Sequence, residues 1–246
     1  MTRAELKKYA YRLRKAGKSY TAIKELTSLS KSTLSILLRN VSLSSKAEGR
    51  INKRTDVARK LASEALRSKR VNSSTHTILE SWNETKEKMN DPLFLLGTSL
   101  YWAEGGKTRE MISFSNSDPH MIQVILQWLR EYCGVPENKL RVQIHIHSLH
   151  SRVDVERHWS YITKIPLHQF NKTYIKHTSL GHRKNILYDG TCIIRVHDSK
   201  LFRKYIGWKL GLLELLGIIR FSPDEKKKFV NEMIEKRTYK LLPLTP

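Results

Sequence analysis

The sequence predicts an α+β protein in which an all-helical N-terminal region precedes a mixed α/β region with an antiparallel sheet. Apolar residues in the first ninety positions recur at helical spacing, whereas from Asp91 onward several segments alternate with period two between Gly and Pro. We therefore expect a helical domain over residues 1–43, a helical linker over 44–90, a mixed α/β domain over 91–221, and a C-terminal helix and tail over 222–246.

Two short helices joined by a tight turn are expected after an amphipathic first helix. Residues 3–16 are basic and amphipathic, and this helix ends at Gly17. Ser19 then caps a segment with apolar residues at helical spacing, and residues 28–30 supply a turn before a helix over 31–40. The residues of that last helix expected to face inward are Leu34, Leu37 and Leu38.

These elements contain the segments Gly17-Lys-Ser-Tyr-Thr-Ala-Ile-Lys-Glu-Leu and Leu29-Ser-Lys-Ser-Thr-Leu-Ser-Ile-Leu-Leu-Arg39. The stretch resembles the helix-turn-helix of resolvase-type bacterial regulators, and its second half matches best. It departs from the usual pattern at Lys24, Thr27 and Ser28, where a small Ala, an apolar residue and Gly are common.

A helix-turn-helix places its second helix in the major groove, so the exposed positions there should be small, polar or basic. In this sequence they are Lys31, Ser32, Thr33, Ser35 and Arg39. Contacts to phosphate are expected from Lys18 and from Arg12, Arg14 and Lys15 of the first helix. The alternative interpretation is a surface helix that merely carries polar side chains.

The expected linker is polar and strongly basic. The stretch over residues 42–83 is rich in Ser, Lys and Arg and contains no Pro. Its few apolar residues have helix-like spacing, which predicts a tethering helix rather than a loose coil. These apolar residues are Val57, Leu61, Ala65 and Leu66.

The charge of the chain indicates a polyanionic partner. Lys and Arg total 45 against 23 Asp and Glu, a net charge of +22. Residues 1–90 hold 21 basic and 8 acidic side chains, and residues 91–246 hold 24 and 15. Nucleic acid is therefore the expected partner. The helix-turn-helix pattern favours double-stranded DNA, and RNA is the alternative.

Location is predicted from cysteine content and hydropathy. Two cysteines, Cys133 and Cys192, are too few for a disulfide framework or a Cys-rich zinc module. The N-terminus has no apolar signal region, and charged residues interrupt the apolar stretch 206–221. We expect a cytoplasmic, nucleoid-associated protein without a membrane partner.

The second region is expected to alternate helices with strands. Asp118-Pro119 and Ser222-Pro223 each place a capping residue before Pro at a helix start. The predicted order is helix 93–103, strand 111–116, helix 119–132, strand 141–147, helix 155–163, strands 173–177 and 192–197, helix 200–216, and a last helix to about residue 239.

The first of these helices carries the segment Gly97-Thr-Ser-Leu-Tyr-Trp-Ala-Glu-Gly105. It resembles the motif of the LAGLIDADG homing endonuclease family. Ser99 stands at the Gly of that motif, Ala103-Glu104-Gly105 matches its end, and residues 112–118 resemble the strand and helix cap that follow. The resemblance covers roughly residues 91–216 and implies a LAGLIDADG-like α-β-β-α-β-β-α plan.

The resemblance also implies a chemistry. In this family acids at the ends of two packed helices bind Mg²⁺, which activates water for phosphodiester cleavage. It therefore implies Glu104 as the catalytic residue and Glu104 with Gly105 as metal ligands. Because one chain carries one motif, two chains would pair through the helix over residues 94–104 as a homodimer. A mobile element would be a typical source of such a homing-type DNA endonuclease.

Two alternatives to cleavage remain open. Glu104 can be a surface Glu before a Gly cap, and Trp102 stands where many family members have an acidic or polar residue. Both features fit a non-catalytic transcriptional regulator that binds DNA. The third alternative is an RNA-binding, maturase-like splicing cofactor.

The predicted strands have one apolar and one polar face, independently of any resemblance. A basic face with hydrogen-bonding groups suits a sheet that lies along DNA, although it can also be an ordinary solvated face. The polar-face residues predicted to bind DNA are Arg141, Gln143, His145, His147, Lys172, Lys176 and Arg195. We expect no zinc site at His145, His147 and His150, because the spacing matches no known zinc module.

Overall fold

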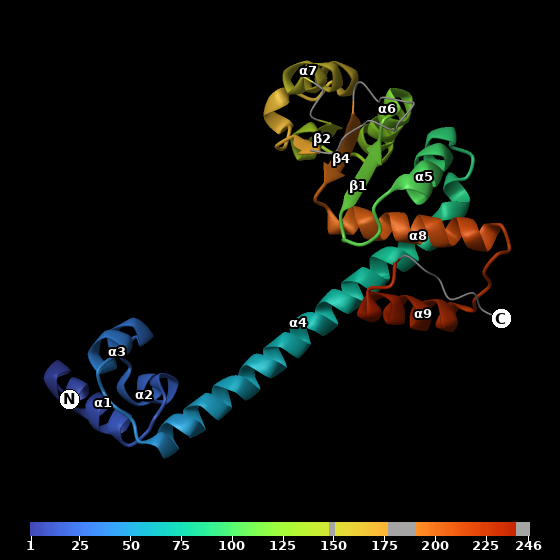
Figure 1. The fold of residues 1–246 in the computed structure, drawn as a ribbon. Coiled ribbons are helices and arrows are strands. Elements are labelled where there is room, and N and C mark those ends of the chain that lie inside the picture. The colour runs from blue at the N-terminus through green and yellow to red at the C-terminus, as the bar shows by residue number, and fades with distance from the viewer. Residues whose placement is uncertain (148–150, 177–189, 240–246) are drawn as a thin grey trace. The chain divides into compact units, whose positions relative to one another are not determined.

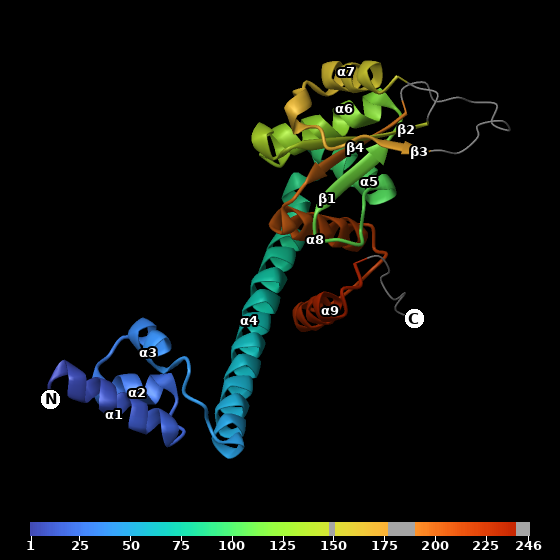
Figure 2. The same ribbon diagram turned by 60° about the vertical axis from the view of Figure 1, so that its left-hand side comes forward.

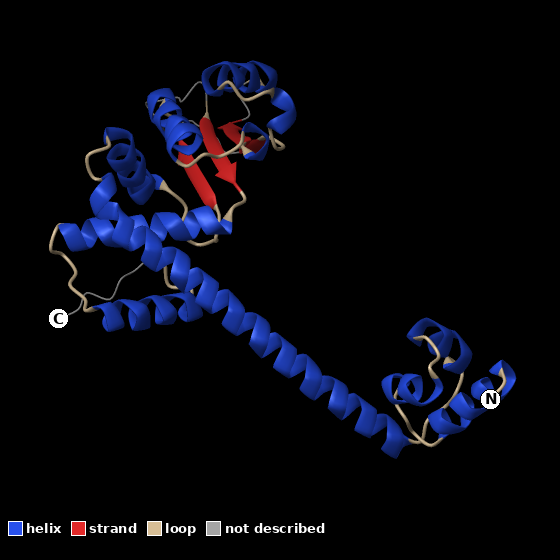
Figure 3. Cartoon of the chain, turned by 180° about the vertical axis from the view of Figure 1, so that it is seen from behind, coloured by secondary structure: helices blue, strands red, loops and turns tan. Residues whose placement is uncertain are grey.

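The computed structural model describes residues 1–147, 151–176 and 190–239. The chain divides into two compact units, Met1–Lys69 and Arg70–Pro246. The boundary falls within α4 (Ser45–Lys88), the long helix in Figure 1. The predicted α+β class is confirmed, and Figure 3 shows strands only in the second unit.

Three capped helices form the N-terminal part of the first unit: α1 (Arg3–Lys15), α2 (Tyr20–Thr27) and α3 (Lys31–Leu38). The side chain of Thr2 and that of Glu5 form a capping box at α1. Ser19 Oγ accepts a hydrogen bond from the backbone N–H of Ala22, and Ser30 Oγ accepts one from that of Thr33. The predicted helices are therefore present where the sequence places them.

The core of this three-helix arrangement contains a polar residue. Thr27 is 3% exposed, but its hydroxyl donates to the Ile23 carbonyl oxygen at 2.6 Å, so its burial leaves no unsatisfied group. Lys24, the other unusual residue of α2, is exposed. The buried apolar residues are Ala10, Ile23, Leu34, Leu38 and Val41.

The turn between α2 and α3 has a left-handed residue. Ser28 ends α2 with φ 54° and ψ 11°. Glycine is favoured in this region because it lacks a Cβ. Ser28 therefore holds a conformation that costs a residue with a Cβ more than it costs Gly.

The helix α4 includes the predicted linker helix, but its two ends have different surroundings. Val57, Leu61 and Leu66 are all more than half exposed. Ile78 and Trp82 are instead buried in the core of the second unit. The residues from Arg70 to the end of α4 therefore belong to a folded core as well as connecting the units.

The second unit contains a four-stranded sheet in the order β1-β4-β2-β3. The strands are β1 (Ile112–Asn116), β2 (Arg141–His147), β3 (Tyr174–Lys176) and β4 (Thr191–Val196). β4 pairs antiparallel with β1 and β2, but β3 pairs parallel with β2. The prediction of an antiparallel sheet was therefore wrong for β3, because helix α7 (Arg152–Thr163) forms a crossover that returns the chain in the same direction.

The element order matches the prediction. The other helices of this unit are α5 (Pro92–Glu104), α6 (Pro119–Gln127) with its continuation η1 (Trp128–Tyr132), α8 (Ser199–Leu215) and α9 (Pro223–Lys236). Short helical turns η2 (Glu137–Lys139) and η3 (Leu167–Gln169) connect elements. Figure 2 shows α6 and α7 beside the sheet, whose apolar face packs into a core shared with the helices.

The helices α8 and α4 pack so closely that at two glycines of α8 there is no room for a Cβ atom. A Cβ at Gly207 would lie 2.4 Å from the Ile78 carbonyl oxygen, and one at Gly211 would lie 2.3 Å from Thr85 Oγ1. Two reciprocal hydrogen bonds flank this crossing. Trp82 Nε1 donates to Glu214 at 2.8 Å, and Trp208 Nε1 donates to Glu84 at 2.8 Å.

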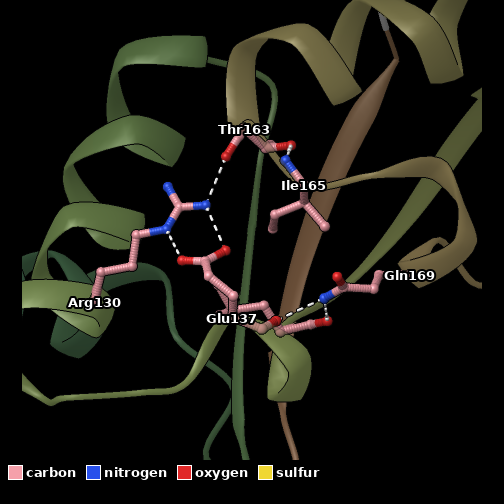
Figure 4. A network of polar contacts seen from close by, with 6 residues as sticks. Arg130, Glu137, Thr163, Ile165 and Gln169 are labelled. Atoms are coloured by element: carbon pink, nitrogen blue, oxygen red, sulfur yellow. Dashed lines mark hydrogen bonds and ion pairs between the residues drawn. The ribbon is translucent and has the colours of Figure 1, made fainter.

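A polar network fixes the segment that leads into β2 (Figure 4). Arg130 donates to both carboxylate oxygens of Glu137, at 2.5 and 3.1 Å, and to the Thr163 carbonyl oxygen at 2.8 Å. Gln169 Nε2 donates to the carbonyl oxygens of Glu137 and Leu140. These contacts tie the ends of η1 and α7 to the start of β2, which positions the polar face of that strand.

No helix in the described part of the chain has both the length and the apolar character needed to cross a membrane. The long helix α4 is mostly exposed and charged over its first half. Cys133 and Cys192 are both free thiols, and burial raises the pKa of each.

Candidate nucleic-acid interface

The open face of α3 carries the predicted base-contacting residues. Lys31, Ser32, Ser35 and Arg39 are exposed, while Leu34 and Leu38 are buried on the opposite side. Thr33 is half-buried, and its hydroxyl lies 2.8 Å from Ser30 Oγ, as does that of Ser32. The N-cap therefore fixes the positions of two hydroxyl groups at the start of this face.

One exposed residue of α3 was missed by the sequence interpretation. Ile36 is 74% exposed and lies between the polar Ser35 and the half-buried Leu37. An apolar residue in an amphipathic helix is normally assigned to the core. Its position four residues after Ser32 and three before Arg39 is the signal that places it on the open face.

The predicted phosphate contacts near α1 divide into two groups. Arg12, Lys15 and Lys18 are exposed. Arg14 is instead half-buried, lies 4.4 Å from the ring centroid of Tyr20, and donates to the Lys18 carbonyl oxygen at 3.1 Å. Arg14 thus stabilises the packing of α1 on α2 by a cation–π contact, a role that spacing alone did not predict.

The polar face of β2 is present as predicted. Arg141, Gln143, His145 and His147 are each partly exposed, and the residues between them are buried. The pairing of β4 with β2 places Arg195 opposite Arg141. Two guanidinium groups from neighbouring strands are therefore on the same face of the sheet.

The remaining predicted sheet residues lie at the other end of this face. His145 is paired with Tyr174 and His147 with Lys176, and the His145 and Tyr174 ring centroids are 5.2 Å apart. Lys176 is exposed. Burial lowers the pKa of His145, and the nearby positive charges of Lys176 and Arg195 lower it by smaller amounts. The imidazole of His145 is therefore mainly neutral at pH 7.

Two side chains on this face are oriented by backbone carbonyls. Gln143 Nε2 donates to the carbonyl oxygen of Lys172 at 3.1 Å, and the Lys172 side chain is exposed. Arg141 Nη1 donates to the carbonyl oxygens of Asn138 and Leu140 at 2.7 and 2.8 Å. Residues 150 and 177, named in the sequence interpretation, lie outside the described residues.

The end of α5 is tied to the loop before β1 by one tyrosine. Tyr101 is buried, and its hydroxyl donates to the Gly106 carbonyl oxygen at 3.0 Å and accepts from the Ser113 N–H at 3.1 Å. Burial raises the pKa of Tyr101 to about 12. A Cβ at Gly105 would lie 2.3 Å from the Tyr101 carbonyl oxygen, which explains the Gly after Glu104.

A pocket of about 360 Å³ adjoins this connection. It contains two arginines, a histidine and two hydroxyl side chains, and it contains no acidic residue. Such a lining suits an anionic group. The lining residues are Gly106, Thr108, Arg109, Met111, Ser113, Arg195 and His197.

The predicted catalytic and metal-binding residues, Glu104 and Gly105, directly precede the first lining residue of this pocket in the sequence. Glu104 is exposed at the last position of α5. The Gly105 carbonyl oxygen accepts a hydrogen bond from Lys107 Nζ at 2.8 Å, which places a positive charge where a cation would bind. Within the described ranges, no three His, Cys, Asp or Glu side chains gather as a metal-binding group.

The helix α5 has a buried and an open face. Phe94, Gly97, Thr98 and Tyr101 are buried. The opposite face combines the small residues Ser99 and Ala103 with two large apolar residues, Leu96, which is 49% exposed, and Trp102, which is 37% exposed. The helix α5 is therefore buried on one face only. Exposed residues of the open face are Leu96, Ser99, Trp102 and Ala103.

The comparisons with known proteins returned no match. No model of a protein family, no curated protein and no solved structure is significantly similar to this chain. The function of this chain is therefore inferred from its own geometry and charge.

Proposed function

We propose that this chain is a sequence-specific DNA-binding protein that reads bases with α3 and contacts the phosphate backbone with basic side chains of both units. The observation that carries the proposal is the open face of α3, where exposed hydroxyl and cationic side chains are backed by buried leucines. Side chains of this kind are suited to the edges of base pairs in the major groove, as in a helix-turn-helix.

Charge supports the same proposal. Residues 1–69 contain 18 Lys and Arg against 5 Asp and Glu, a net charge of +13. Such an excess attracts a polyanion and adds affinity that does not depend on base sequence. The polar face of the sheet adds the opposed Arg141 and Arg195 and the exposed Lys172 and Lys176.

The test begins with selection of duplexes that the full-length chain prefers from a random pool. Affinity is then measured for the selected duplex and for a scrambled one. Arg39→Ala and Lys31→Ala should lower the preference by about tenfold, which corresponds to a typical base contact. Lys60→Ala removes the same charge from the exposed side of α4 and serves as the control. Absence of any enriched sequence would contradict the proposal.

The second candidate function is cleavage of the bound DNA. It is favoured by the exposed Glu104 and by the cationic pocket that follows it along the chain. Mg²⁺ is commonly held by one or two carboxylates together with phosphate oxygens. One chain does not fit a metal site by itself, since no three ligand side chains gather in its described part and Lys107 is bound to the Gly105 carbonyl oxygen.

A second copy of the chain would supply a second carboxylate. The open face of α5 has small and apolar residues that suit close pairing of two helices. We therefore include a homodimer through α5 in this second candidate. Ser99→Arg should convert a dimer to a monomer in sedimentation experiments, whereas Ser35→Arg on α3 should leave the oligomeric state unchanged.

Cleavage is tested on supercoiled DNA that contains the selected site, with Mg²⁺ or Mn²⁺ added. Glu104→Gln should abolish nicking while preserving DNA affinity, because it removes one charge and little volume. Glu64→Gln on α4 is the control. Wild-type protein that binds the site and leaves it intact would favour the regulator. Tighter binding to an RNA of the same sequence would favour the maturase-like alternative.

A further inference from the structure

Ile36, the exposed isoleucine of α3, is not part of the apolar core of the first unit. Leu34 and Leu38, on the other side of α3, make the buried contacts of this helix with the rest of the core. Ile36 lies outside that apolar cluster. Ile36 is 74% exposed. A polar residue at this position would be compatible with the same packing, so the Ile36 side chain is available for contact with a partner.

The neighbours of Ile36 restrict the chemistry of that partner. Ser32, Ser35 and Arg39 lie one helical turn away or less on the same open face. Their hydroxyl and guanidinium groups can bond to polar atoms on base edges, but Ile36 has only methyl and methylene groups. In the major groove the one apolar group on a base edge is the C5-methyl group of thymine.

We propose that Ile36 is a specificity-determining residue that selects thymine by contact with its C5-methyl group. This inference rests on the proposed function of α3 in reading DNA. The positive charges of Lys31 and Arg39 on either side would hold the helix against a polyanion, which brings Ile36 to the floor of the groove.

The test uses the full-length chain and the duplex that it selects. Each thymine is replaced in turn by deoxyuridine, which lacks only the methyl group. At one or two positions the wild-type affinity should fall about fourfold, the equivalent of one buried methyl group. Ile36→Ser should bind the thymine duplex more weakly and should lose this sensitivity, whereas Ile36→Val should retain it.

Leu26→Ser is the matched control, because Leu26 is a similarly exposed apolar residue on α2. It should keep the wild-type response to deoxyuridine. An enriched sequence with the same deoxyuridine response in wild type and Ile36→Ser, or with no response in either, would overturn this inference and leave the proposed function standing. A pool without enrichment would overturn both.

Discussion

Arg195 on β4 lies directly opposite Arg141 on β2, with both side chains on the open face of the sheet. Like charges in this relation repel each other and destabilise a sheet. Arg141 is turned toward the carbonyl oxygens of Asn138 and Leu140, which offsets part of that repulsion. A bound anion would offset it further.

The first prediction follows from this pair. Arg195→Gln should lower DNA affinity and reduce the slope of log affinity against log salt by about one, since one phosphate contact is lost. The measurement is a titration of an unrelated duplex over a series of salt concentrations. Lys236→Gln, which alters an exposed ion pair within α9, should leave the slope unchanged. If both variants gave the same slope, the sheet would not be part of the DNA interface.

The second prediction concerns the turn between α2 and α3. Ser28→Gly should stabilise the first unit by about 0.5–1 kcal/mol, because Gly adopts the left-handed conformation at φ 54° without steric cost. Ser28→Val should destabilise it. Amide hydrogen exchange at the buried Ile23 and Leu34 reports on this unit and would show the change. Faster exchange in the Gly variant would contradict the assigned conformation.

The third prediction concerns a buried lysine. Lys209 is 3% exposed, and its Nζ donates to the Tyr239 carbonyl oxygen at 3.2 Å. Burial, with a smaller contribution from the charge of Lys107, lowers the pKa of Lys209 from 10.5 to about 8. The unfolded chain therefore binds this proton more tightly than the folded one, and the group's contribution to stability rises between pH 8 and pH 10.5.

Lys209→Met should thus stabilise the protein at pH 7, by roughly 1–3 kcal/mol, and the gain should shrink as the pH rises toward 10. Denaturant unfolding followed by tryptophan fluorescence suits the measurement, since all five tryptophans lie in the second unit. Lys236→Met on the exposed side of α9 should show no such trend. A gain that is constant with pH would exclude the titration of Lys209.

The fourth prediction concerns the crossing of α8 with α4. Gly211→Ala should destabilise the second unit by about 1–3 kcal/mol, because the added Cβ overlaps Thr85 at 2.3 Å. Gly49→Ala makes the same change where no atom lies within 4 Å, and it should be neutral or stabilising. Thermal unfolding followed by circular dichroism at a helical wavelength compares the two. Similar effects for both would contradict close packing at Gly211.

Local sequence signals predicted the elements well. Caps such as Ser19, Asp118 and Ser222 act on their own helices, so their effect can be read without knowledge of the fold. The alternation of Arg141 to His147 predicted the polar face of β2 for the same reason, because the side-chain direction in a strand depends only on position.

Features that depend on distant residues were not predicted. The parallel pairing of β3 depends on the path taken through α7, and the pocket depends on the meeting of the 106–113 segment with β4. The core position of Trp82 also escaped the sequence interpretation, since it lies in a polar stretch. A large aromatic residue there was the available signal.

The contact of Gly207 and Gly211 with α4 also determines where the chain can be divided. A fragment that begins at residue 91 would leave α8 with an uncovered groove at these glycines and would remove Ile78 and Trp82 from the interior. Such a fragment should aggregate or bind hydrophobic dyes. A recombinant version of the second unit therefore has to start at or before Arg70, with several turns of α4 retained as part of its folded body.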